Sequence, residues 1–245
     1  FMAMGYLLCR AKDLKLIRLK MSAKSIALAF RNVGYHCRIG SSTLLGELAL
    51  AVMFYVGNRV FMHYLGDTGV GAYGIACYYM PFFFMVGNSI AQSAQPIISY
   101  NYGIDRWTRI VEARKVLLMT CLGFGVAVSL IFILFPKGLV GLFIPIESEA
   151  AIIAINGFPL LSIGILFFIL NVAIIGYYQS VERMGKATLY VFLRGFVFIV
   201  PCFLILPKFL GTVGIWLAMP TSELLTSLFI ALSVLPSRLK SLRKR

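Results

Sequence analysis

Charged residues are scarce in this chain, and most of those present are basic. Only 13% of the 245 residues are Asp, Glu, Lys or Arg, whereas about a quarter of the residues in a soluble domain are charged. Apolar residues make up 60% of the sequence, and the mean hydropathy is +0.89. This composition excludes an ordinary soluble enzyme and a disordered chain. It predicts an all-α polytopic membrane protein.

Cysteine and histidine are few, and the common catalytic motifs are absent. The five cysteines are widely spaced and contain no CxxC pair, so we expect neither a disulfide framework nor a cysteine metal site. His36 and His63 are the only histidines, which argues against a histidine metal site. There is no Walker-type phosphate loop, HExxH or GxSxG pattern. We therefore expect no catalytic residues, no metal and no cofactor, and we do not expect an enzyme.

Long apolar runs dominate the rest of the sequence. A helix that crosses a bilayer needs about 20 mostly apolar residues. Six runs meet this requirement, and they cover residues 40–65, 71–99, 116–135, 150–178, 187–206 and 213–235. The sequence therefore predicts six transmembrane helices.

The basic residues cluster between these runs and indicate their orientation. Nineteen of the 23 Lys and Arg residues lie in alternate connections, namely residues 10–38, 100–115, 179–186 and 236–245. The loops on the opposite side of the membrane contain only Lys137 and Lys208. Cytoplasmic loops carry such an excess of Lys and Arg, so we expect the C-terminus to be cytoplasmic. We expect a multi-pass protein of the plasma membrane, which in a bacterium is the inner membrane. The net charge of +14 is then a property of loops beside the lipid bilayer, and no nucleic-acid partner is expected.

The second apolar run carries a stripe of polar residues. The stripe begins at Asn88 and continues at Gln92, Gln95 and Ser99, which lie four, seven and eleven residues after Asn88. At about 100° per residue, these offsets place all four within an arc of about 60° on one helix face. One interpretation is the wall of a water-filled substrate or cation cavity. The other is a set of hydrogen bonds between helices.

Ionisable residues occur inside three of the other runs. Glu47 shares a helix face with Phe54 and Asn58 in the first run, and this group could line a binding cavity. Glu223 in the sixth run is a further candidate for the substrate or cation cavity. It could carry a proton, or it could serve as a protonated structural hydrogen-bond donor. Arg194, two turns into the fifth run, could pair with a carboxylate. We expect it instead to snorkel toward the cytoplasmic interface.

Four segments resemble motifs of the MATE (multidrug and toxic compound extrusion) transporters. Residues 87–103 are similar to the family's GxxQxxQPxxxxNYG run, and residues 177–186 to its FFQAxGxxK turn. Leu193 and Arg194 are similar to the start of an LRQ motif, and residues 214–223 resemble GVWxAxPxS followed by an acid. The four segments occur in the family's order along the chain.

This resemblance implies a fold of twelve helices in two six-helix lobes, with a cavity between the lobes. Residues 40–235 would form the C-terminal lobe, and the basic tail 236–245 would be cytoplasmic. Residues 1–9 would end a preceding transmembrane helix, and 10–39 would be a basic cytoplasmic linker between the lobes. The chain would then be a C-terminal fragment whose partner is the N-terminal lobe.

The resemblance also implies an activity, the export of organic cations or amphipathic drugs in exchange for H⁺ or Na⁺. One branch of the family uses an acid in helix seven, and Glu47 is the acid in the matching helix here. The acid that the family carries in helix ten has no counterpart, because residues 150–178 contain no Asp or Glu.

Three alternatives remain at this point. A related lipid-linked saccharide flippase would need a strongly cationic cavity, but the spans contain only two Lys or Arg residues, Arg59 and Arg194. A membrane-embedded enzyme would need paired acids, or a nucleophile and a base, at one depth, and neither pattern is found. A non-transporting membrane subunit would not need the polar stripe.

Overall fold

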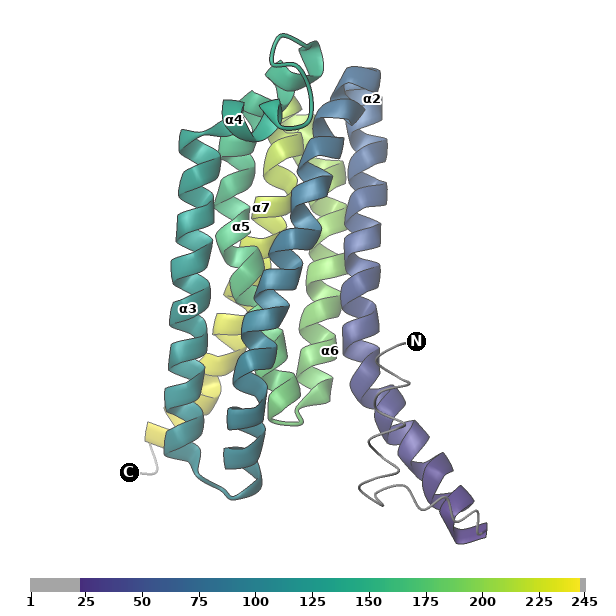
Figure 1. Ribbon diagram of the computed structural model, residues 1–245, viewed down its shortest axis with the longest axis vertical. Coiled ribbons are helices and arrows are strands. Elements are labelled where there is room, and N and C mark those ends of the chain that lie inside the picture. Colours follow the sequence, from purple (N-terminus) through teal and green to yellow (C-terminus); the bar gives the residue numbers. More distant parts are fainter. Residues whose placement is uncertain (1–22, 243–245) are drawn as a thin grey trace, which may run out of the picture. The chain divides into compact units, whose positions relative to one another are not determined.

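The computed structural model describes residues 23–242, with side chains described throughout residues 40–233 and at some earlier positions. Every regular element in this part of the chain is a helix (Figure 1). The elements are α2 (Ala23–Gly103), α3 (Trp107–Leu134), α4 (Pro136–Gly141), α5 (Glu149–Ser180), α6 (Met184–Phe192), the π-helix η1 (Leu193–Phe198) and α7 (Ile199–Leu242). The predicted all-α membrane fold is confirmed. The expected helix tail at residues 1–9 lies outside the described residues.

Two of the longest helices are each broken at a glycine. α2 turns at Gly66, where φ is 62°, and α7 turns at Gly211, where φ is 55°. These positive φ values favour glycine because it has no Cβ to clash with the backbone. Four continuous stretches are long and apolar enough to span a membrane, and two of these fold back at their glycine. The described chain therefore contains six spanning segments, in agreement with the sequence.

The helices extend beyond the apolar runs that revealed them. α3 begins at Trp107, nine residues before the predicted start at residue 116. Its first turns carry an exposed ion pair, in which Arg109 Nη1 lies 3.3 Å from Glu112 Oε2. Because only the apolar part of a helix needs to match the bilayer, hydropathy marks the depth of the membrane and does not mark where the helix ends.

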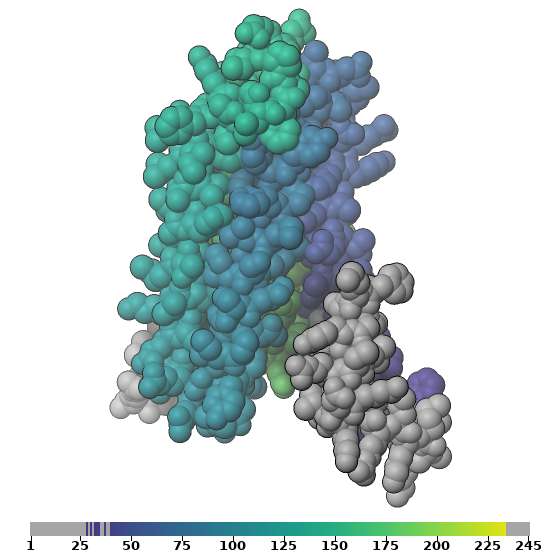
Figure 2. All heavy atoms as spheres, viewed as in Figure 1, coloured from purple at the N-terminus to yellow at the C-terminus, as the bar shows by residue number. Residues whose placement is uncertain are grey.

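The chain divides into two compact units, residues 1–40 and residues 41–245. In the first unit, the described residues 23–40 are helical, and they include much of the segment predicted as a basic linker. The second unit is a helical bundle in which α5 packs against α3, α4, α6 and α7. Figure 2 shows one face of it, on which the part of α2 after Gly66 lies along α3.

An aromatic core fills the half of this bundle that contains α4. Tyr79, Phe83, Phe132 and Phe158 contact one another with ring centroids 5.0–6.3 Å apart. All but Tyr79 are at most 2% exposed. Edge-on and offset contacts of this kind add to the stability that burial provides, so this half of the bundle is closely packed.

Small residues bring the helices together in the other half of the bundle. A Cβ placed on Gly176 of α5 would lie 2.6 Å from the Cβ of Ala91 in α2. A Cβ on Gly195 of η1 would overlap Ala49. Small residues permit such close backbone approach in membrane bundles. They hold α2, α5 and η1 close to one another.

Candidate functional site

A cavity of about 150 Å³ lies in the half of the bundle away from α4. Both helices of α2 contribute to its wall, together with α5, α6 and η1. Its polar lining includes a carboxylate, four side-chain amides and a guanidinium, which belong to Glu47, Asn88, Gln92, Gln95, Gln179 and Arg194. Apolar residues such as Phe84 and Val172 complete the lining. The cavity can therefore offer both hydrogen bonds and apolar contact to a small molecule.

The structure brings together four of the residues selected from the sequence. Asn88, Gln92 and Gln95 line the cavity from one face of α2, as their spacing predicts, and Glu47 lines it from the preceding helix. Gln92, Gln95 and Glu47 are exposed, and Asn88 is half-buried. Within the described chain, Glu47 makes no hydrogen bond or ion pair with another side chain. Its carboxylate is therefore available to a ligand.

Three other selected residues lie apart from the cavity. Phe54 packs against the hydrophobic core, and Asn58 is exposed. Asn58 shares an azimuth with Glu47, but it lies eleven residues away, which is about 16 Å along a helix axis at 1.5 Å per residue. Ser99 donates a hydrogen bond to the carbonyl oxygen of Ser180 at 3.0 Å, so it ties α2 to the end of α5.

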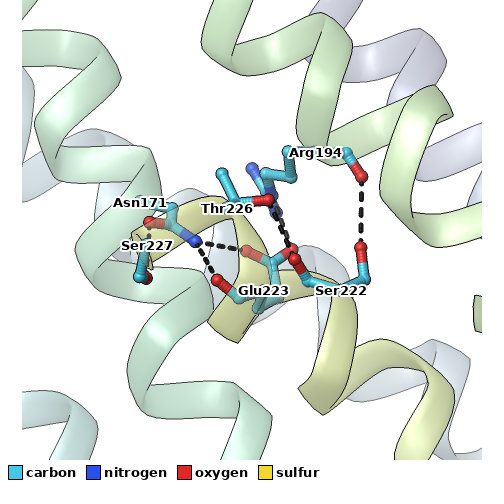
Figure 3. Close-up of polar contacts among 6 residues, drawn as sticks. All are labelled: Asn171, Arg194, Ser222, Glu223, Thr226 and Ser227. Carbon is cyan, nitrogen blue, oxygen red and sulfur yellow. Dashed lines mark hydrogen bonds and ion pairs between the residues drawn. The ribbon is translucent and has the colours of Figure 1, made fainter. Parts of the chain in front are cut away.

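Glu223 is the eighth selected residue, and it belongs to a buried ion pair instead of the cavity wall (Figure 3). Arg194 Nε donates to Glu223 Oε1 at 2.6 Å, and Asn171 Nδ2 donates to Oε2 at 2.8 Å. The Arg194 and Glu223 side chains are only 7% and 3% exposed. The guanidinium also lies over the ring of Phe168, 4.0 Å from its centroid. Both carboxylate oxygens thus have donors in an otherwise apolar setting.

Hydroxyl groups complete this network. Ser227 Oγ donates to Asn171 Oδ1 at 2.9 Å, and Ser222 Oγ donates to the Arg194 carbonyl oxygen at 3.4 Å. Asn171 Nδ2 also donates to the backbone carbonyl of Glu223 at 2.9 Å. The network therefore joins α5, η1 and the second helix of α7 (Figure 3).

The expectation that Arg194 snorkels to the interface is wrong. Its side chain is buried and pairs with Glu223. The physical reason is depth. Arg194 lies ten residues after the start of α6 at Met184, and Asn171 lies nine residues before the end of α5 at Ser180. Glu223 reaches the same level from the adjacent helix, so Arg194 meets a carboxylate inside the bundle.

Sequence reasoning did not select Asn171 or Gln179 as site residues. Asn171 is fully buried, and Gln179 Nε2 donates to Ser42 Oγ at 2.9 Å on the cavity wall. Counting residues from the short 181–183 connection would have placed Asn171 and Arg194 at one depth. The amide of Asn171, well inside the apolar run of α5, was therefore the available signal.

The MatE family model matches residues 43–204 of the chain. These bounds contain both helices that form most of the cavity wall, together with Asn171 and Arg194. No curated protein sequence matches the chain.

Several solved transporter structures have a similar fold. An outward-facing multidrug resistance MATE family transporter of the MOP superfamily superimposes with a TM-score of 0.75 at 18% identity, and the match covers 85% of this chain and 47% of the other. A mutant of the Vibrio cholerae MATE transporter VcmN gives 0.80 at 16% identity, covering 98% and 53%. A Pyrococcus furiosus MOP superfamily transporter, described as having a binding pocket of reverse polarity, gives 0.73 at 16% identity, covering 82% and 46%. The chain thus spans about half the length of these structures.

Proposed function

This chain belongs to the MatE family, and from that membership we propose that it is the C-terminal lobe of a secondary active multidrug efflux antiporter. The proposed substrate is an organic cation or amphipathic drug, and the driving ion is H⁺ or Na⁺. The family model and the similar transporter folds support a transport role. The specific observation behind the choice of substrate is the cavity, in which Glu47 lies beside three amides of α2.

The chemistry of the cavity wall suits an amphipathic cation. An unpaired carboxylate attracts positive charge, and its effect is strengthened where little water surrounds it. The amides of Asn88, Gln92 and Gln95 can hydrogen-bond to polar groups of the substrate without adding charge. Apolar contacts come from Phe84 and Val172. Binding of H⁺ or Na⁺ at Glu47 would compete with the substrate cation, which is one simple way to couple opposite fluxes.

The proposed partner of this lobe is a second six-helix lobe. Gln92 and Gln95 are exposed on α2 although they lie within a span. Polar groups in lipid are costly, so we propose that the second lobe covers this face and closes the cavity. We further propose a plasma-membrane location with the C-terminus in the cytoplasm. The excess of Lys and Arg in the connections on that side supports this orientation.

The test replaces Glu47 with glutamine in the full-length transporter that contains this lobe. Glu47→Gln keeps the size of the side chain and removes the charge, so we expect export of a fluorescent organic cation such as ethidium to fall more than tenfold, or about 1.4 kcal/mol. Export would be measured in everted vesicles across imposed pH and Na⁺ gradients, at matched protein levels.

Glu112→Gln provides a matched control, because Glu112 is an exposed α3 residue outside the cavity. We expect the control to export normally. Normal export by Glu47→Gln would place the cation site outside this lobe and would contradict the proposed role of the cavity.

A further inference from the structure

Arg194 uses only part of its guanidinium group in the buried network. Nε faces Glu223, and one flat side covers the ring of Phe168. Within residues 23–242, neither Nη nitrogen makes a hydrogen bond to the protein. An arginine carries four N–H groups on these two nitrogens, so a cationic edge with several donors remains unused on a side chain that is 93% buried, given its 7% exposure.

The unused edge faces open space. Among the described residues, no fully buried side-chain nitrogen or oxygen lacks a hydrogen-bond partner, so the free Nη groups are not sealed inside the packing. Arg194 lines the 150 Å³ cavity and also a void of about 10 Å³ beside Phe168 and Glu223. A void of that size holds about one water molecule. Any larger acceptor can reach Arg194 only from the cavity.

We propose that the Nη edge of Arg194 is a substrate-selecting site, which favours organic cations that also carry a neutral hydrogen-bond acceptor such as a carbonyl oxygen. The proposal rests on the proposed function, since it places the cationic group of the same ligand near Glu47. Hydrogen bonds from a charged donor are stronger than those between neutral groups. Arg194 thereby adds to the cavity a preference that charge alone does not give.

The charges around the cavity explain why the acceptor is neutral. Glu223 already balances the charge of Arg194, so a ligand that pairs with Glu47 as a monocation leaves no charge unmatched. A dianionic ligand such as a diphosphate would find no uncompensated positive charge there and would be repelled by Glu47 on the same wall. The cation with a carbonyl group satisfies both ends of the cavity.

Two matched probes test this selectivity. The 4-acetyl and 4-isopropyl derivatives of N,N,N-trimethylanilinium have the same charge and nearly the same shape, but only the first has an acceptor. Binding of each to the purified full-length transporter that contains this lobe would be measured in detergent by isothermal titration calorimetry. We expect the acetyl compound to bind about tenfold more tightly, because a site that donates hydrogen bonds discriminates against a ligand that lacks the acceptor.

Arg194→Lys is the main variant. The lysine ammonium can still pair with Glu223, but it lacks the second nitrogen edge toward the cavity. In this variant we expect the acetyl and isopropyl compounds to bind with about equal affinity. The affinity for the isopropyl compound should be the same as in the wild type. Arg109→Lys makes the same substitution on the exposed part of α3 and should keep the preference. If Arg194→Lys does not fold, the paired variant Arg194→Gln with Glu223→Gln replaces it. The comparison of the two probes on the wild-type protein can be made without any variant.

The outcomes separate this inference from the proposed function. Equal binding of the two probes by the wild type, or an acetyl preference that survives in Arg194→Lys, overturns the role of Arg194 and leaves cation binding intact. Failure of the wild type to bind either probe overturns both proposals. Glu47→Gln should weaken both probes alike, because it removes the charge that they share.

Discussion

Two carboxylates in the spans, Glu47 and Glu223, have opposite surroundings. Glu223 is 2% exposed, and both of its carboxylate oxygens accept hydrogen bonds. Glu47 is exposed on the wall of a cavity, and no side chain in the described chain pairs with it. The sequence alone presents them alike, as acidic residues within apolar runs.

The difference separates a structural acid from one that is available to a ligand. Burying a carboxylate costs several kcal/mol unless charge and hydrogen bonds compensate it. At Glu223 the protein supplies that compensation through Arg194 and Asn171, so removing any member leaves the others unsatisfied. At Glu47 compensation is left to water, an ion or a substrate. Changes in the network should therefore lower stability, and changes on the cavity wall should lower transport.

The largest effect is expected when Glu223 is removed. Glu223→Leu leaves the guanidinium of Arg194 buried without a counter-charge, and we expect a loss of about 3 to 5 kcal/mol in the free energy of unfolding. Denaturant unfolding in detergent micelles, followed by circular dichroism, would measure it. Glu47→Leu is the matched substitution on the cavity wall and should change stability by less than about 1 kcal/mol.

Removing both charges sharpens this test. The paired variant Arg194→Met with Glu223→Leu replaces the ion pair by apolar side chains and should recover most of the lost stability. Equal destabilisation by the single and paired variants would show that packing is the cause, because no charge is left unmatched in the paired variant.

A smaller loss is expected at Asn171. Asn171→Ala removes the donor to Glu223 Oε2 and the acceptor for Ser227, so we expect about 1 to 3 kcal/mol of destabilisation by the same measurement. Asn58→Ala makes the same change at an exposed position and should have little effect. If the two variants were equally stable, Asn171 would not be part of what holds Glu223.

The smallest effect is expected at Ser99, which shares the polar face of α2 with the cavity residues. Ser99→Ala removes a hydrogen bond to Ser180 and should cost about 0.5 to 1.5 kcal/mol without changing ethidium export. Gln95→Ala should show the reverse pattern, with normal stability and lower export. Similar export by both variants would contradict the expected difference, because it would show that Ser99 and Gln95 contribute equally to transport.

Hydropathy was sufficient to predict the fold but not the site. The six apolar runs gave the spanning segments, because apolar length is what the bilayer selects. Helical periodicity correctly placed Asn88, Gln92 and Gln95 on one face. Periodicity gives an angle around one helix, however, and contacts between helices also depend on depth. Asn58 therefore shared the angle of Glu47 but lies far from the cavity, whereas Arg194 and Glu223 met because their depths agree.

The turn at Gly211 has a consequence for how the chain enters the membrane. Arg194 and Glu223 lie on the two arms of one helical hairpin, since the chain reverses at this glycine between them. An isolated arginine at the centre of an inserting helix costs about 2.5 to 3.5 kcal/mol on translocon scales, and an acidic residue also opposes insertion. If the two arms enter together, each charge brings its counter-charge into the lipid. The hairpin is then the natural unit of biosynthetic insertion, and lengthening its turn should impair membrane integration before it affects the folded protein.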